Sequence, residues 1–253
     1  MPDRLPKLVL RGVDFQSDSL QLSYGFDGEL QAATPSLHAI TELFVANAAH
    51  GAFSAGVPLA MSIATTQPAA DSQLEYVLSR TRGLERHAFQ CLRNMARRLR
   101  RDGVLARSIG VTGSSQGPAA DEPLDWPSEQ TEETSYSRGS ERIEALIVRE
   151  DSDFAKSRRC LVRIAGVPDT ASVEAFEAHV RPWYLLLEAG GYAMPIEWPE
   201  DSDCIAGSVS QFDEQTIEIA VSRFQASELA WIALANMAVS FWGAQSIERI
   251  IID

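Results

Sequence analysis

Apolar positions in the first 112 residues follow two periods. Five short segments alternate apolar and polar residues or form compact apolar runs, which is typical of β-strands. Two longer segments repeat apolar residues every three to four positions, as amphipathic helices do. Thr34 and Pro35 predict the start of the first helix, Gly51 predicts its end, and Gly103 ends the second. The predicted strands are 8–15, 19–26, 58–66, 72–80 and 104–111, and the predicted helices are 34–51 and 84–103.

Residues 141–253 repeat this order of elements. Asp169 is expected to cap a helix that ends at Gly190 and is kinked at Pro182. The last predicted helix, 226–242, is apolar on almost every side, so we expect it inside the core. The predicted strands of this half are 142–148, 159–167, 203–212, 216–224 and 246–253, the third and fourth of them forming a hairpin.

Each half therefore contains a strand–helix–strand–strand–helix–strand unit preceded by an extra strand. This six-element order is the split βαβ arrangement of ferredoxin-like domains. The segments Leu74–Arg80 (LEYVLSR) and Ile217–Arg223 (IEIAVSR) also share Glu, Ser and Arg at equivalent positions. We predict an α+β protein of two similar halves, each an antiparallel or mixed sheet with two helices. An internal duplication is favoured over an unrelated pair of domains.

A segment without periodicity separates the two halves. Residues 113–140 contain three prolines and six acidic residues against one arginine, Arg138. Such composition predicts a linker or a long acidic loop. The expected organisation is an N-terminal half (1–112), an acidic Pro-rich linker (113–140) and a C-terminal half (141–253).

Composition and charge narrow the class of partner. A hydrophobic fraction of 45% is enough for a core and excludes disorder as the main state. The 35 acidic residues outnumber the 22 Lys and Arg, a net charge of −13, which argues against nucleic acid or an anionic membrane surface. No stretch has the length and flanks of a signal peptide or a membrane span. Three cysteines without zinc or redox spacing suit a reducing compartment, so we expect a cytoplasmic protein without a cofactor.

One loop matches two catalytic patterns. Gly113–Gly117 (GSSQG) fits the GxSxG nucleophile elbow, with Ser115 as nucleophile, and the surrounding VTGSSQGPA resembles the nucleotide loop of short-chain dehydrogenases. Pro118 and the following carboxylates suit neither a long helix nor a phosphate site, and no YxxxK pair occurs in the chain. A linker is the favoured interpretation, and Ser115 is the only nominated nucleophile. We expect a protein that is not an enzyme.

Four histidines are scattered over the predicted helices. His38 lies one helical turn before Glu42, and His87 lies one turn before Cys91. Either pair offers half of a metal site, but nothing in the sequence brings the two halves together. Surface or partly buried histidines are the favoured interpretation, and no metal is expected.

The segment around one predicted helix is strongly positive, although the chain as a whole is negative. Nine arginines and only two acids lie between Arg80 and Arg107. Four of these arginines share a face, a pattern found in helices that contact phosphates. Only Phe89 offers a ring on which a base could stack. A solvated face, or a contact with the acidic segment downstream, is therefore favoured over nucleic-acid binding.

The strongest acidic patch is in the second half. Residues 196–218 hold seven acids and no Lys or Arg, and Trp198 stands among them. Carboxylates around an aromatic anchor are typical of inhibitors of basic enzymes. A calcium loop is disfavoured because the Gly and final Glu of an EF-hand are missing, whereas a solvated loop remains an alternative. The predicted partner-binding residues are Glu197, Trp198, Glu200, Asp201, Asp203, Asp213 and Glu214.

The C-terminal run TIEIAVSRFQASELAWIALANMAVSFW, followed by SIERIIID, resembles bacterial immunity proteins. These are the cytosolic antidotes of polymorphic or type VI secretion toxins. The resemblance implies that the chain binds one cognate toxin, in many cases a nuclease, and covers its active site. Carboxylates would then take the place of nucleic-acid phosphates in a basic cleft. We expect a non-catalytic inhibitor of a toxin with a basic surface; the alternative is a tandem ferredoxin-like module that binds or senses a small ligand.

Overall fold

The chain forms two compact units. The computed structural model describes residues 6–65, 72–113, 122–123, 147–149, 157–193, 207–222, 226–227 and 229–252. The first unit comprises Met1–Ala49 and Leu59–Ser135, and the second comprises His50–Pro58 and Tyr136–Asp253. The short segment 50–58, which connects two elements of the first unit, therefore belongs to the second unit.

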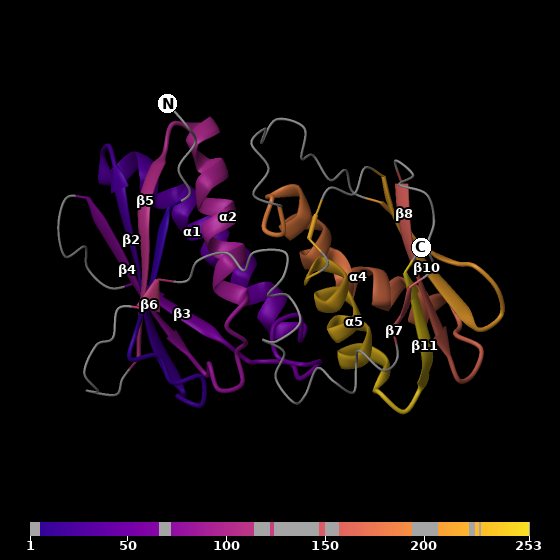
Figure 1. Cartoon of the computed structure of the whole chain (residues 1–253). Coiled ribbons are helices and arrows are strands. Elements are labelled where there is room, and N and C mark those ends of the chain that lie inside the picture. Colours follow the sequence, from indigo (N-terminus) through magenta and orange to yellow (C-terminus); the bar gives the residue numbers. More distant parts are fainter. Residues whose placement is uncertain are drawn as a thin grey trace. The chain divides into compact units, whose positions relative to one another are not determined.

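The first unit is a mixed six-stranded sheet with two helices on one face (Figure 1). The sheet order is β3-β4-β2-β5-β1-β6, in which β1 runs parallel to β5 and the other neighbours are antiparallel. Its elements are β1 (Lys7–Arg11), β2 (Ser19–Asp27), α1 (Leu30–Ala49), β3 (Ser62–Thr65), β4 (Gln73–Ser79), α2 (Ala88–Arg98), a 3₁₀-helix (Leu99–Asp102), β5 (Leu105–Gly113) and β6 (Glu122–Pro123).

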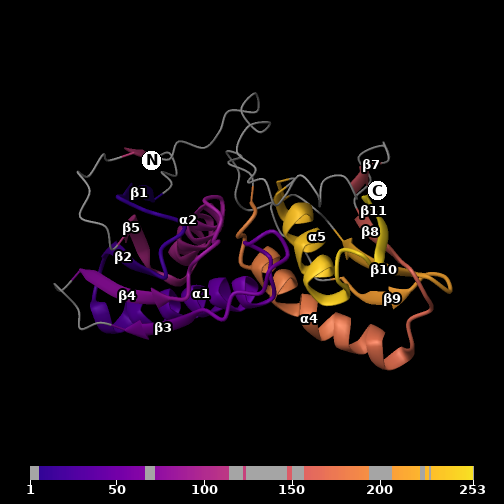
Figure 2. The ribbon, with the colours of Figure 1, turned by 90° about the horizontal axis from the view of Figure 1, so that it is seen from below.

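The second unit is a five-stranded sheet, again with two helices on one face (Figure 2). Its order is β7-β11-β8-β10-β9, in which β7 runs parallel to β11 and the other neighbours are antiparallel. Its elements are β7 (Ile147–Arg149), β8 (Ser157–Ile164), α4 (Thr170–Glu188), β9 (Val209–Gln211), β10 (Thr216–Ser222), α5 (Leu229–Trp242) and β11 (Ile247–Ile252).

The two units have the same topology. In each, the chain order is strand–helix–strand–strand–helix–strand, and these four strands lie in the sheet order 2-3-1-4 of the ferredoxin-like fold. In each, the extra N-terminal strand pairs in parallel with the last strand of the unit. The short sequence match falls on equivalent strands, β4 and β10. The predicted fold class, α+β with two similar halves and an added strand, is confirmed.

The core of the first unit follows from strand alternation. On β2, Leu20, Leu22, Tyr24 and Phe26 are all buried, and the residues between them are not. Because successive strand residues point to opposite faces, these four side chains pack under the helices. The Tyr24 hydroxyl and the Thr41 hydroxyl of α1 are 2.9 Å apart, so the buried hydroxyl of Tyr24 is satisfied.

The core of the second unit is built around α5. Every residue from Ala230 to Ala238 is buried, which confirms that this apolar helix lies inside the core. Trp231 packs against Trp183 of α4, with ring centroids 5.8 Å apart, and the Trp183 indole N–H donates to the Ala230 carbonyl at 2.8 Å. The two helices are thus joined by both apolar area and a directional bond.

Two predicted helix starts are wrong. Helix α1 begins at Leu30, one turn before the predicted cap, and the Thr34 hydroxyl donates to the Leu30 carbonyl instead of capping. Pro35 lies early in the helix, where few backbone bonds are lost. Helix α2 begins only at Ala88. Helix α4 continues through Pro182, with buried side chains on both sides of the proline, so the helix does not break there, and the predicted kink stays a prediction.

Most of the predicted linker, residues 114–121 and 124–140, lies outside the described residues. Of the remainder, Glu122–Pro123 forms β6, which pairs with Val9 and Leu10 of β1. This short pairing was not expected from a segment without periodicity. Among the helices in the described part of the chain, none is long and apolar enough to cross a lipid bilayer.

Candidate functional site

The predicted partner-binding residues are only partly within the described chain. Glu197, Trp198, Glu200, Asp201 and Asp203 lie outside the described residues, and their role stays a prediction. Asp213 and Glu214 are exposed in the turn between β9 and β10, which confirms the predicted hairpin.

The Asp213 carboxylate forms a hydrogen bond within the turn to which it belongs. It accepts a hydrogen bond from the Gln215 backbone N–H at 2.8 Å. This bond to the charged form is the main reason that the pKa of Asp213 is lowered. Asp213 is therefore an ionised, exposed group at the tip of the hairpin.

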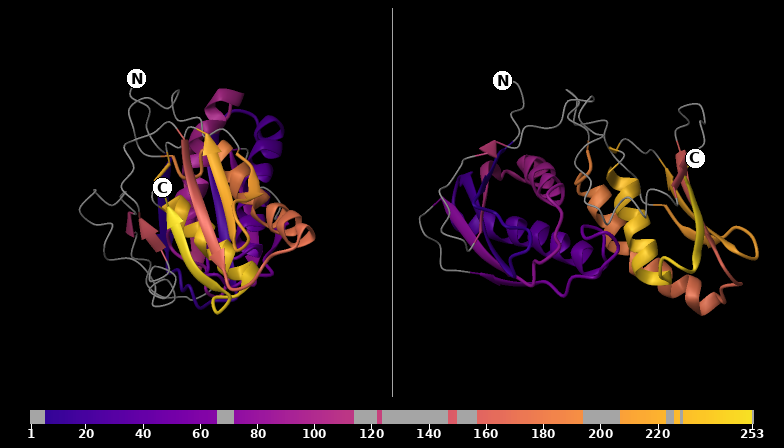
Figure 3. Two further views of the ribbon diagram at one scale, coloured as in Figure 1. Left: turned by 90° about the vertical axis from the view of Figure 1, so that its right-hand side faces the viewer. Right: turned by 60° about the horizontal axis from the view of Figure 1, so that its bottom comes forward.

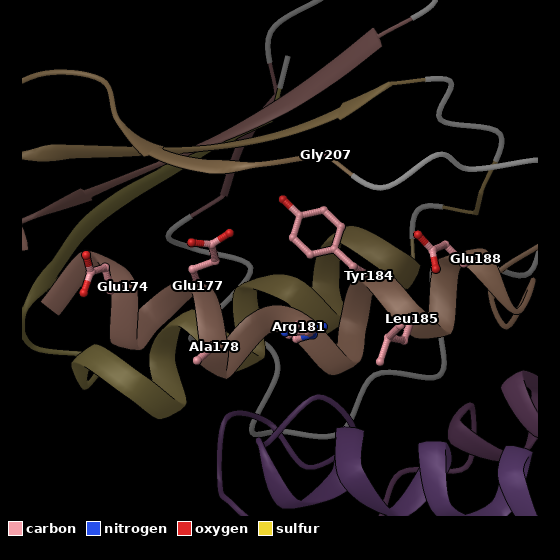
Figure 4. A pocket seen from close by; sticks show the side chains of 8 residues that line it. All are labelled: Glu174, Glu177, Ala178, Arg181, Tyr184, Leu185, Glu188 and Gly207. Carbon is pink, nitrogen blue, oxygen red and sulfur yellow. The ribbon is translucent and has the colours of Figure 1, made fainter. Parts of the chain in front are cut away.

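An open pocket of about 570 Å³ lies along the exposed side of α4 (Figure 4). The residues of α4 that line the pocket recur every three to four positions, so they lie on one side of the helix and form a stripe at the base of the pocket. The residues that line it are Glu174, Glu177, Ala178, Arg181, Tyr184, Leu185, Glu188 and Gly207. In Figure 4 the side chains of Glu177, Tyr184 and Glu188 extend from the helix toward the chain at Gly207.

The fold holds this stripe of α4 in place from both ends. At the start of the helix, Asp169 accepts a hydrogen bond from the Ser172 backbone N–H at 2.7 Å, as predicted for an N-cap. Near its end, the Tyr184 hydroxyl donates to the Ala220 carbonyl of β10 at 3.3 Å. Burial, then Cys160 and Glu177, raise the pKa of Tyr184, so the phenol stays a neutral donor.

The charge of the pocket is predominantly negative. Its lining contains three glutamates against one arginine, Arg181, and all four side chains are exposed. Leu185, among these charges, is 45% exposed. A concave surface with carboxylates around an exposed leucine suits a partner that offers basic side chains next to an apolar one. The pocket also includes Gly207, which follows the predicted acidic binding segment in the chain.

Sequence reasoning missed the α4 stripe because it considered only the apolar side of this helix. The signal was present, since Glu174, Glu177, Arg181 and Glu188 recur at spacings of three, four and seven residues. Such spacing places charged side chains on one face. That this face lines a pocket follows from the position of Gly207, which no local pattern predicts.

The other nominated residues show ordinary local contacts. His38 Nε2 is 3.2 Å from the Glu42 carboxylate, as the i,i+4 spacing suggested. His87 Nδ1 is 3.2 Å from Glu85, a partner that was not predicted. Ser115 lies outside the described residues. Within the described ranges, no three His, Cys, Asp or Glu side chains gather as metal ligands.

A histidine pair in the second unit was not anticipated. His50 Nδ1 and His179 Nδ1 are 2.9 Å apart, and the two rings meet edge to face with centroids at 4.4 Å. The residues are separated by 129 positions in the chain. Burial is the main reason that the pKa of each is lowered, to about 4 for His179.

A second hollow lies on the first unit's sheet, on β2 and β5. Its volume is about 340 Å³, and its lining includes Ser23, Gly25, Arg107 and Ser108. Gly25 pairs with Ser108 and Ser23 with Gly110 across the two strands, so these four positions carry only small side chains. Hydroxyl groups and one guanidinium give the hollow a polar lining.

Comparisons with known proteins do not assign a family. No family model matches the chain, and no curated protein matches it. Among solved structures, a chlorite dismutase from Candidatus Nitrospira defluvii covers 93% of this chain and 88% of its own, at 9% identity and a TM-score of 0.19. A Cas6 product complex covers 93% and 99%, at 12% identity and a TM-score of 0.16. Likeness this weak carries no argument about function.

Proposed function

We propose that this protein is a non-catalytic inhibitor that binds a cationic partner protein, an immunity protein whose cognate toxin has a basic active-site surface. The observation that carries the proposal is the α4 pocket, with three glutamates around the half-exposed Leu185. The toxin would offer lysine or arginine side chains to Glu174 and Glu177, and an apolar side chain to Leu185. Such an arrangement combines electrostatic steering with a small apolar anchor.

The charge distribution supports the same class of partner. The chain has a net charge of −13, and the stripe on α4 adds to the acidic segment that precedes Gly207. A negative surface raises the rate at which a basic protein arrives, and salt screens this effect. A nuclease has a basic cleft because its substrate is a polyanion. Covering that cleft with carboxylates would block the substrate without any chemistry by the inhibitor.

The test is binding to the protein encoded by the adjacent gene, prepared as a catalytically inactive variant. The double variant E174K/E177K reverses two exposed charges of the stripe. We expect its Kd to rise by about tenfold or more, mostly through slower association, since charged groups at an interface act on encounter. Raising salt from about 0.1 M to about 1 M should remove most of the difference, because the Debye length falls from ~10 Å to ~3 Å.

The matched control is D18K/E29K, which makes the same change in net charge at two exposed positions of the first unit. This variant should keep a Kd within about twofold of the unmodified chain, if the stripe rather than total charge is recognised. Equal weakening by both double variants would show that only net charge matters. Unchanged binding of E174K/E177K, or no binding to the adjacent gene product at all, would refute the proposal.

A second candidate, a tandem ferredoxin-like module for a small ligand, rests on the hollow over β2 and β5. Its serines, Gln73 and Arg107 suit a small polar molecule rich in hydroxyl or carboxylate oxygens. Thermal-shift screening with sugar acids and amino acids is the test. A stabilisation that disappears in S108V, in which the hollow loses a hydroxyl, supports this candidate. Absence of any shift across such a panel would leave the inhibitor as the remaining proposal.

A further inference from the structure

Segment 50–58 is an unusual connection, because it joins α1 to β3 of the first unit and yet packs in the second. Ala52 and Phe53 are fully buried. The Asn236 side-chain amide of α5 donates to the Ala52 carbonyl at 3.1 Å. The segment is therefore held on α5 by a directional bond to its backbone.

The glycines of this segment permit close packing on α5. A Cβ at Gly51 would lie 2.9 Å from the Ser240 Cβ, and a Cβ at Gly56 would lie 2.8 Å from Val239 Cγ1. Both glycines have φ near +80°, a conformation that side-chain-bearing residues rarely adopt. The segment thus has a specific seat rather than a loose contact.

The His50–His179 pair attaches the beginning of the segment to α4. A hydrogen bond between two Nδ1 atoms requires that one ring carries the proton there and the other accepts it. The pair can share one additional proton, because an imidazolium still donates to a neutral imidazole. With two additional protons both Nδ1 atoms are donors, so the bond is lost and two cations face each other at contact distance.

Among the described residues, no carboxylate acts on the pair to compensate for a second charge. Helix α5 contains no ionisable side chain, and segment 50–58 contains only His50. On α4, the ionisable neighbours Glu177 and Arg181 are exposed and line the pocket. Phe241 packs on the His179 ring, with centroids 5.2 Å apart. Burial and then the neighbouring His50 lower the pKa of His179, against a smaller opposite effect of the carbonyl groups of His50 and Met237.

We infer that the His50–His179 pair is a proton-operated latch, which holds segment 50–58 on the second unit until both imidazoles are protonated and then releases it. The inference is independent of the proposed function. In the released segment His50 takes up its proton with an ordinary pKa of about 6.5, whereas in the latched pair the pKa of both histidines is lowered. The ratio of released to latched segment should therefore grow by about tenfold per pH unit below about 6.5.

Hydrogen–deuterium exchange on the full chain tests the latch. Protection factors, which correct for the intrinsic pH dependence of exchange, are measured for amides of segment 50–58 and of α5 between about pH 7 and pH 4.5. We expect the protection of segment 50–58 to fall by about 100-fold over the two units below pH 6.5. Protection within α5 should fall far less, because the second unit stays folded when the segment leaves.

Two variants remove the titration and keep a hydrogen-bonding group. H50N and H179N each place an amide near the Nδ1 position without a group that ionises in this range. We expect the pH dependence of the segment's protection to shrink by at least tenfold in either variant. The matched control is H38N, which changes a partly exposed histidine of α1 that is paired with Glu42. This control should retain the full pH dependence.

The outcomes separate a latch from general acid sensitivity. Equal loss of protection in segment 50–58 and in α5 would mean that the whole unit unfolds, and would overturn the inference. The same pH profile in H50N as in the unmodified chain would also overturn it. If H179N does not fold, H50N decides the question, since His50 is only partly buried.

Discussion

The two units have one topology but different second helices. In α2 the buried residues include Gln90, Arg93 and Asn94, whereas in α5 the only polar residue buried between Ala230 and Ala238 is Asn236. Both helices nevertheless lie at the same place in the same strand order. The same strand order thus accommodates a second helix that buries several polar side chains in one unit and almost only apolar ones in the other.

The outer faces of the two sheets also differ in the side chains that they carry. In the first unit small residues on β2 and β5 leave a polar hollow. In the second unit, whose strands β8, β10 and β11 stand in front in the left view of Figure 3, charged side chains bridge the strands. Arg159 lies 3.7 Å from Glu218, and Arg163 lies 3.1 Å from Glu248. One face offers space for a ligand, and the other is covered by its own ion pairs.

The largest expected effect concerns the aromatic pair that joins the two helices of each unit. Phe44 of α1 stacks on Phe89 of α2, with centroids 5.7 Å apart, as Trp183 of α4 packs on Trp231 of α5. W183A should lower the free energy of unfolding by about 3–5 kcal/mol, and F44A by slightly less because a smaller cavity remains. Urea denaturation followed by circular dichroism measures both. A loss below about 1 kcal/mol in W183A would contradict the view that this pair organises the core.

The next effect compares two glycines with similar positive φ. A Cβ on Gly56 would meet Val239 and the Asn236 backbone, whereas a Cβ on Gly83 would have no neighbour within 4 Å. G83A should cost about 1–2 kcal/mol, the cost of a left-handed alanine. G56A should cost about 1–3 kcal/mol more because its methyl group enters occupied space. Thermal and urea unfolding of the two variants give the difference, and equal costs would show that segment 50–58 is not tightly seated.

The third prediction concerns pH. Burial lowers the pKa of His87 in the first unit and of His50 and His179 in the second. A histidine whose folded pKa is lowered stabilises fully above the unfolded pKa of about 6.5, and stability is lost as pH falls toward the folded pKa. The slope is at most about 1.4 kcal/mol per pH unit for each group. Urea titrations between about pH 7 and pH 5 should show a shallower slope for H87N and for H50N; an unchanged slope in either would exclude that histidine as the cause.

The smallest effect is expected at the ion pairs. Arg163 and Glu248 are each 48% exposed, and Arg107 and Asp27 of the first unit, 2.7 Å apart, are similarly exposed. Exposed pairs contribute about 0–1 kcal/mol, so E248Q and D27N should each change the unfolding free energy by no more than about 1 kcal/mol. Chemical denaturation at low and high salt checks this. A loss above about 2 kcal/mol would show that these pairs hold the sheets together.

Sequence periodicity predicted the strands and the order of elements well, because strand alternation and helical spacing are local and each unit buries one face of its sheet. Helix starts were less predictable. Thr34 and Pro35 have the residue types of a cap, yet α1 already begins at Leu30. The same residue types are tolerated in the first turns of a helix, so the packing of the preceding chain decides between the two positions.

For the candidate sites too, local sequence patterns predict only part of what the structure contains. The excess of acid and its concentration in the second half are properties of the sequence, and the expectation of a basic partner rests on them without any fold. The α4 pocket exists because the chain at Gly207 passes beside one stripe of the helix. The histidine pair exists because segment 50–58 packs in the other unit.

The sequence therefore specifies two similar α+β halves, their strand and helix order, and the acidic balance of the chain. The folded chain decides which charged stripe lines a concave surface, and which histidines meet across 129 residues. The physical reason is that side-chain direction repeats with a short local period, whereas contacts between distant segments depend on how complete elements pack. A pattern confined to neighbouring residues contains no information about such contacts.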